Sequence, residues 1–241
     1  MSPKPARPRY AAEVVDVRPI TPHMRRITLA GEGLRLLGID RPAQWVKLFF
    51  PGQEGVARIG RAYTVRGFSH AFAAMDVDFV LHGDDGPASR WAARAERGEM
   101  LDVAGPRGGH AIDPRAKNYI LVGDATALPA ICAIVEALPA HVRARLFIEV
   151  ANKAEEQRLR SNAALDVQWL HSGAEAPGAT GRLELAVQAA DLDTRNCQAW
   201  IAGESFMVRS VRTHLTVDRG VPEHALDSQG YWKLGVADAR G

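Results

Sequence analysis

Apolar and polar residues alternate in the first half of the chain, in runs that predict β-strands. Residues 10–17 alternate until Arg18-Pro19, and residues 23–29 alternate until Gly31. Because successive side chains on a strand point to opposite faces, such runs are typical of strands with one buried face. Other strand-like runs cover residues 45–50, 61–66, 76–81 and 100–103. Short strands with this glycine and proline punctuation predict a small antiparallel β-barrel.

One helix is expected to interrupt these strands. It begins at Gly86-Pro87, passes through Trp91 and ends near Gly98. Proline suits the first helical turn, because its missing N–H would have no partner inside the helix there.

The second half has a different pattern, in which strand-like and helix-like segments alternate. The expected strands are 118–122, 145–150, 167–170 and 199–202. The expected helices are 128–138, 155–162, 181–190 and 204–215. This alternation predicts an α/β domain with a parallel, doubly wound sheet. The pattern breaks around Pro114, so we expect domains at residues 1–114 and 115–241.

Composition narrows the class of protein. A net charge of +2 and 7% aromatic residues disfavour a nucleic-acid partner. Two cysteines, Cys132 and Cys197, are too few for a disulfide framework or an iron–sulfur cluster, and no CxxC or HExxH metal motif is present. No run of about 18 apolar residues occurs, and the basic residues 1–8 precede no apolar stretch. We therefore expect a cytoplasmic protein without a bound metal or a membrane span. We also expect a monomer, although nothing in the composition determines the oligomeric state.

The segment Arg61-Ala62-Tyr63-Thr64-Val65-Arg66 combines residue types that a flavin needs. An aromatic plane suits the isoalloxazine ring, cations suit the diphosphate, and polar groups suit N5. On a strand, Arg61, Tyr63 and Val65 share one face, and Thr64 and Arg66 share the other. A half-exposed strand with two solvated arginines explains the same residues, so this segment alone leaves both interpretations open.

Two further segments place glycine before a helix start, where backbone N–H groups favour phosphate. The first runs from His82 to Trp91, with the N–H groups of Ala88 and Ser89 as the expected donors after Gly86-Pro87. The second is Val122-Gly123-Asp124-Ala125-Thr126-Ala127, which is not a GxGxxG fingerprint. Here Asp124 has a structural alternative, as a cap of the following helix.

The order of the motifs is more specific than any one of them. Arg-x-Tyr-Thr-x-Arg at 61–66 is followed by His-Gly-x-x-Gly-Pro-Ala-x-x-Trp at 82–91, Gly-Pro-Arg-Gly at 105–108, Val-Gly-Asp-x-Thr-Ala-Leu-Pro-Ala at 122–130, Ala-Gly-Glu-Ser at 202–205 and Gly-Tyr-Trp-Lys-x-Gly at 230–235. This series resembles the siderophore-interacting protein family, which comprises FAD-dependent ferric-siderophore reductases of the ferredoxin-reductase-like superfamily. The resemblance implies an FAD-binding barrel followed by an NAD(P)H-binding-like α/β domain.

The resemblance also implies which residues bind FAD. They are Arg61, Tyr63, Thr64, Val65, His82, Gly86, Pro87, Ala88, Ser89, Asp124, Thr126, Ala127 and Trp232. No protein side chain is expected to be catalytic, because the flavin carries the electrons. Two positions depart from the family pattern: Ala125 stands where an acid is common, and Lys233 where arginine is common. Lysine keeps the charge but not the bidentate grip, which leaves the donor and the substrate less defined.

The expected reaction is reduction of an Fe(III)-siderophore to Fe(II), which releases iron in the cytoplasm. An often anionic chelate calls for a basic cluster, for which we select Lys47, Arg107 and Lys233. Lys47 interrupts an apolar strand, although snorkelling to solvent also explains it. The electron donor is expected to be NAD(P)H or reduced ferredoxin. The alternatives are a general NAD(P)H:acceptor flavin reductase and a non-catalytic ferric-siderophore binding flavoprotein.

Overall fold

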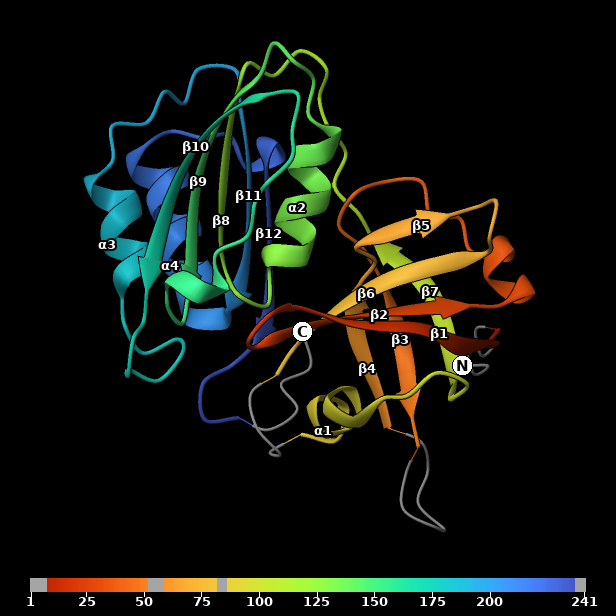
Figure 1. The fold of residues 1–241 in the computed structure, drawn as a ribbon. Helices are drawn as coiled ribbons and strands as arrows, with labels where there is room; N and C mark the ends of the chain where they lie inside the picture. Colours follow the sequence, from red (N-terminus) through yellow and green to blue (C-terminus); the bar gives the residue numbers. More distant parts are fainter. Residues whose placement is uncertain (1–7, 52–58, 82–85, 237–241) are drawn as a thin grey trace, which may run out of the picture. The chain divides into compact units, whose positions relative to one another are not determined.

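The structure is a computed structural model, and it describes residues 8–51, 59–81 and 86–236. The chain divides into two compact units, Met1–His110 and Ala111–Gly241, which are described separately below. Figure 1 shows that the first unit consists mainly of strands and that the second has helices packed on a sheet.

The first unit is an antiparallel sheet. Its strands are β1 (Tyr10–Thr21), β2 (Met24–Ala30), β3 (Gln44–Phe50), β4 (Ile59–Thr64), β5 (Gly67–Ser69), β6 (Ala74–Val80) and β7 (Met100–Gly108). They pair in the order β4-β3-β7-β1-β2-β6-β5. Tyr63 on β4 meets Phe79 on β6 with ring centroids 4.3 Å apart, although these strands lie near opposite ends of that order. The sheet therefore wraps around a common core, and the predicted antiparallel fold is confirmed.

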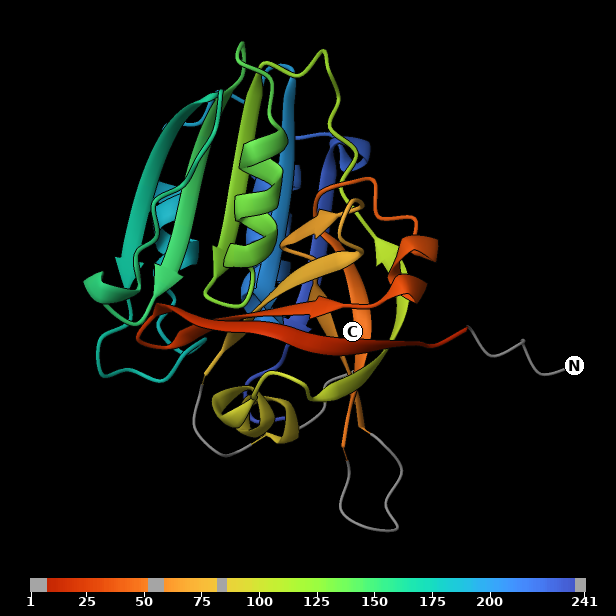
Figure 2. The same ribbon diagram turned by 45° about the vertical axis from the view of Figure 1, so that its right-hand side comes forward.

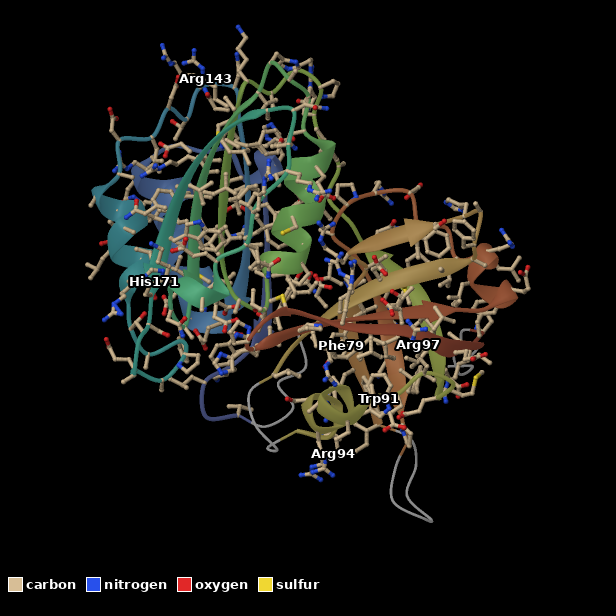
Figure 3. The ribbon with its side chains drawn as sticks, in the orientation of Figure 1. Phe79, Trp91, Arg94, Arg97, Arg143 and His171 are labelled. Carbon is tan, nitrogen blue, oxygen red and sulfur yellow. The ribbon has the colours of Figure 1, made fainter. Side chains whose placement is uncertain are left out.

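That core depends on strand alternation. In β3, Val46, Leu48 and Phe50 are fully buried, whereas Lys47 between them is exposed. Helix α1 (Pro87–Arg94) covers the core, and its Trp91 ring lies 5.2 Å from Phe50 and 5.7 Å from Phe79. Figure 3 shows Phe79 and Trp91 between β6 and α1. The core is thus an aromatic cluster closed by one short helix.

Several boundaries in this unit differ from the predicted ones. Strand β7 continues to Gly108 instead of ending at residue 103, β4 spans Ile59–Thr64 instead of residues 61–66, and the short strand β5 was not predicted. Strand β1 continues through Pro19 to Thr21, because an irregularity in its pairing with β2 accommodates the proline. Helix α1 ends at Arg94 rather than near Gly98. The Trp91 indole donates to Glu99, whose other oxygen accepts from the N–H of Glu96, so a turn replaces the last helical residues.

The second unit is a parallel sheet with helices on both faces. Its strands are β8 (Asn118–Asp124), β9 (Arg143–Val150), β10 (Ala164–His171), β11 (Cys197–Glu204) and β12 (Leu226–Trp232). They lie in the order β10-β9-β8-β11-β12, and every pairing is parallel. Figures 1 and 2 show α2 (Leu128–Ala137) on one face and α3 (Arg182–Ala189) and α4 (Ser205–Thr213) on the other. The predicted α/β architecture is confirmed.

The prediction of a helix at residues 155–162 is wrong. The chain forms only a short 3-10 turn, Lys153–Glu155, which Asn152 caps through its side-chain oxygen. The residues after it are polar and have no apolar stripe to bury, so tertiary contacts such as Ser161 Oγ–Val135 O hold them instead. Strand β12 was not predicted, because Gly230 and polar residues interrupt its apolar pattern.

No helix in the described ranges is long and apolar enough to cross a membrane.

Replacement of Phe79 by alanine should lower the free energy of unfolding by about 3–5 kcal/mol, because it removes the ring that Phe50, Tyr63 and Trp91 contact. Urea unfolding followed by circular dichroism measures this loss. Phe72→Ala is the matched control, since Phe72 is 79% exposed and its replacement should change the free energy by less than about 0.5 kcal/mol. Equal effects of the two substitutions would contradict the assigned core.

Candidate functional site

The predicted flavin segment lies on β4, and the register of β3 defines its faces. Tyr63 pairs with Val46 and Arg61 with Leu48, both fully buried, so Arg61 and Tyr63 share the core-side face. Thr64 pairs with Trp45 on the opposite face. Val65 follows the strand, is buried, and donates its N–H to the carbonyl of Gln44. The structure therefore brings Arg61 and Tyr63 together and places Thr64 behind them.

Tyr63 lies at the edge of the aromatic core rather than wholly inside it. Its ring contacts Phe79 and, edge-on at 5.9 Å, Phe50. Burial raises the pKa of the Tyr63 phenol, while the positive charge of Arg61 acts in the opposite direction. The phenol is therefore neutral at physiological pH, and it sits close enough to Arg61 for the two to interact electrostatically.

The second predicted segment forms the start of α1. Gly86 is the N-cap residue, in an extended conformation and without a side-chain cap, and Pro87 occupies the first turn. Ala88 and Ser89 follow, and both are buried. His82 lies outside the described residues. The backbone here has the geometry of a helix start that suits a phosphate group.

The outer face of β3 carries rings and cations together. Alternation places Trp45, Lys47 and Phe49 on this face, and the Arg107 guanidinium lies 5.3 Å from the Trp45 ring. The Lys47 ammonium lies 5.7 Å and the Arg9 guanidinium 3.8 Å from the ring of Phe49. Asp102 opposes Phe49 on β7 and contributes a negative charge nearby. Lys47 and Arg107 therefore belong to one basic, aromatic face.

In the second unit, Asp124 at the end of β8 binds four donors. Its Oδ1 accepts from the N–H (2.8 Å) and the hydroxyl (2.5 Å) of Thr126. Its Oδ2 accepts from the N–H of Glu204 (2.9 Å) and from the indole of Trp232 (2.8 Å). Burial raises the pKa of Asp124, and these hydrogen bonds oppose that effect. The structure thus brings Asp124, Thr126 and Trp232 together.

Asp124 is not the cap of α2. The N-cap residue of that helix is Ala127, which is fully buried and has no side-chain cap. Ala127 instead donates its N–H to the carbonyl of Asp124 in a tight turn. Only glycine at position 203 leaves room for this carboxylate, because a Cβ there would lie 2.5 Å from Asp124 Oδ2. The backbone of Gly203 also has a φ of +138°, which residues with a side chain rarely adopt.

Glu204 ends β11 and caps α4, a role the sequence motif alone did not reveal. One carboxylate oxygen accepts from the N–H groups of Phe206 and Met207, and the other accepts from the N–H of Leu234. Lys233 is exposed beside this contact, with its ammonium 5.3 Å from the ring of Phe206. Glu204 therefore fixes the backbone that presents Lys233.

The described residues contain no group of three or more histidine, cysteine or acidic side chains that would hold a metal ion. Both cysteines are buried, and burial raises the pKa of Cys197 to about 12. A thiol that stays protonated is a poor nucleophile and a poor metal ligand.

The residues present fit a flavin dinucleotide in chemical type. Arg61 supplies a cation beside the aromatic ring of Tyr63, and the start of α1 supplies backbone N–H groups within the same unit. The sequence did not identify Trp45, Phe49 and Arg9 as neighbours of Lys47. Alternation along residues 45–49 would have placed the two rings beside the lysine, but nothing in the sequence brings Arg9 to Phe49.

The Asp124–Trp232 hydrogen bond gives a measurable coupling. Asp124→Asn should lower the free energy of unfolding by about 1–3 kcal/mol, because an amide NH₂ then faces N–H donors. Trp232→Phe should cost less, and the double variant should lose less than the sum of the two, by about 0.5 kcal/mol or more. Urea unfolding of all four proteins measures the cycle, and additive losses would show that the contact does not form in solution.

Two family models match the chain. The siderophore-interacting FAD-binding domain matches residues 13–59 and 53–110, and the siderophore-interacting protein model matches residues 116–235. A ferredoxin NADP+ reductase from Neisseria gonorrhoeae aligns with a TM-score of 0.71 at 16% identity, covering 93% of this chain and 99% of that one. At that identity the likeness supports the ferredoxin-reductase-like fold alone. The first unit is accordingly an FAD-binding domain, and FAD is its cofactor.

Relatives of higher identity cover both units. A siderophore utilization protein from T. fusca is 36% identical, with a TM-score of 0.89 over 97% of this chain and 95% of that one. The ferric vibriobactin reductase ViuB of Vibrio cholerae is 28% identical over 235 residues, which span 90% of this chain and 86% of ViuB. The family expected from the ordered motifs is confirmed: the chain belongs to the siderophore-interacting protein family.

Proposed function

We propose that this protein uses FAD to reduce an Fe(III)-siderophore to Fe(II), and that the reaction releases iron in the cytoplasm. The observation that carries the proposal is the similarity to a ferric vibriobactin reductase along nine-tenths of the chain. The electron donor in this proposal is NAD(P)H, with reduced ferredoxin as the alternative. FAD is assigned to the domain predicted at residues 1–114, and the donor to residues 115–241.

The chemistry of the substrate explains why reduction releases iron. Hydroxamate and catecholate oxygens are hard ligands that hold Fe(III) tightly and Fe(II) less well. Bound FAD supplies a carrier that accepts two electrons from the donor and passes them on singly. In this proposal the protein needs no ligand of its own for the iron.

The proposed role of Lys47, Arg107 and Lys233 is to bind the chelate. Lys47 and Lys233 are exposed, and all three carry their charge near an aromatic ring. A cation over a ring face is attracted by about 0.5–1 kcal/mol at an exposed site, which orders the side chain and leaves its charge available. An anionic complex with flat, partly apolar ligands matches this combination of charge and ring surface.

The proposed FAD-binding residues fall into groups according to the part of the cofactor that each would contact. Arg61 holds the diphosphate, and Tyr63, Thr64 and Val65 border the isoalloxazine ring. Gly86, Pro87, Ala88 and Ser89 form the helix start for the phosphates, and His82 is assigned to FAD by resemblance alone. Asp124, Thr126, Ala127 and Trp232 complete the set. Since the acceptor positions of Asp124 are already filled, its role is to fix the Trp232 indole.

Purification should give a yellow protein that contains FAD, and ferric siderophore should reoxidise its photoreduced flavin. Anaerobic stopped-flow absorbance follows the reoxidation, and an Fe(II) chelator reports the released iron. Quinones and free flavin serve as comparison acceptors. Faster reoxidation by those acceptors would instead indicate a general flavin reductase. Tight chelate binding without reoxidation would indicate a carrier, and a protein that stays colourless after FAD reconstitution would refute the proposal.

Lys47→Ala and Lys233→Ala should each weaken ferric-siderophore binding by about tenfold, as expected for loss of a cation from a charged contact. FAD affinity should change by less than about twofold, because neither lysine is assigned to the cofactor. Fluorescence quenching titrations measure both affinities. Lys117→Ala is the matched control, since Lys117 is exposed at the amino end of β8. Equal losses of FAD and chelate affinity would reject the assigned role.

A further inference from the structure

Glu149 is a buried carboxylate that the proposed reaction does not use. It lies near the carboxyl end of β9, is 7% exposed, and pairs in register with Asp124 on β8. The two carboxylates and Glu204 therefore lie at the same edge of the parallel sheet. This edge is where doubly wound sheets bind their ligands.

Glu149 differs from its two acidic neighbours in its hydrogen bonds. Asp124 accepts four of them and Glu204 accepts three. Both oxygens of Glu149 lie 2.9 Å from the single hydroxyl of Thr180, which has only one proton to donate. Among the described residues Glu149 has no other donor. A carboxylate can accept about four hydrogen bonds, so most of the acceptor positions of Glu149 are unused. These positions lie at the edge of the sheet where such folds bind ligands.

The position of Glu149 in the topology indicates what would use that capacity. The strand order reverses direction between β8 and β11, and β9 is the second strand of the first half. In dinucleotide-binding sheets an acid about 20 residues beyond the first glycine turn accepts hydrogen bonds from the adenosine ribose, and its charge disfavours a 2′-phosphate. Glu149 follows the Gly123 turn at a comparable distance along the chain.

We propose that Glu149 binds the ribose hydroxyls of a nicotinamide dinucleotide without a 2′-phosphate, and so makes NADH the preferred donor over NADPH. This inference rests on the dinucleotide donor of the proposed function. Arg182, whose positive charge influences Glu149, is engaged with Glu175 and with the carbonyl of His171. Its guanidinium is therefore not available to compensate a 2′-phosphate beside Glu149.

In the proposed complex a ribose hydroxyl takes the place of the Thr180 hydroxyl at Glu149. The segment that carries Thr180 also reaches β11 and β12, because a Cβ on Gly178 would lie 2.8 Å from Glu204 Cγ and 2.7 Å from Trp232 Cη2. Gly178 and Gly181 on either side of Thr180 both have a positive φ, of +76° and +64°. Exchange of Thr180 for a ribose thus requires this short segment to shift away from the sheet edge.

Calorimetric titration of the oxidised, FAD-loaded protein with ADP-ribose and with 2′-phospho-ADP-ribose tests the inference. Neither probe contains nicotinamide, so binding is measured without electron transfer. The wild-type protein should bind ADP-ribose at least about tenfold more tightly, because a phosphate beside a carboxylate is strongly disfavoured. Equal affinities, tighter binding of the 2′-phosphate form, or binding of neither probe would overturn the inference.

Three variants assign the preference to Glu149. Glu149→Gln should reduce it to less than about threefold, and an unchanged preference would overturn the assignment. Glu184→Gln removes a nearby charge that makes no hydrogen bond to Glu149 and should keep the preference. Thr180→Val should bind ADP-ribose as tightly as the wild type or more tightly, and a loss of affinity would refute the role of Thr180. Circular dichroism confirms that each variant is folded.

The same preparation separates this inference from the proposed function. If neither probe binds but ferric siderophore still reoxidises the photoreduced flavin, the donor assignment is wrong and the reductase function stands. If the probes bind with the expected preference but no ferric chelate reoxidises the flavin, the ribose site stands and the proposed substrate is wrong.

Discussion

The second unit depends on one half-buried carboxylate, that of Asp124. A carboxylate that loses water on folding is stable only when hydrogen bonds replace that water, and Asp124 accepts four of them from three separate parts of the chain. These donors come from the turn after β8, from the end of β11 and from the end of β12. The ends of three strands are thereby fixed to one another, and Gly203 is required because any side chain there would displace the carboxylate.

The first unit is organised by an aromatic core instead of a polar centre. Phe79 lies among Phe50, Tyr63 and Trp91, which come from β3, β4 and α1. The ring cluster therefore connects the segment that carries Arg61 and Tyr63 with helix α1, whose first turn has no side-chain cap. The opposite face of β3 has the reverse character, with exposed cations lying against Trp45 and Phe49. A single strand thus contributes to the core and to a basic surface through simple alternation.

The acidic residues at the edge of the parallel sheet illustrate how similar side chains acquire different roles. Asp124 and Glu204 have their acceptor capacity filled by backbone, hydroxyl and indole donors, so they act as fixed parts of the framework. Glu149 has the proton of one hydroxyl shared between two oxygens. Carboxylates at the same edge of one sheet thus differ in how many of their hydrogen-bond acceptor positions are filled, and this difference separates a structural carboxylate from one with capacity for a ligand.

The sequence by itself determined the two architectures and the family. Alternation and glycine punctuation predicted most strands of the antiparallel unit, and the ordered motifs predicted the siderophore-interacting family. The sequence failed where structure depends on distant contacts. The helix expected at 155–162 does not form, since Ser161 bonds to Val135 instead, and β12 lacks a local apolar pattern. Only the tertiary structure decided that Trp232 donates to Asp124 and that Arg9 lies on Phe49, because these pairs meet only after the sheets form.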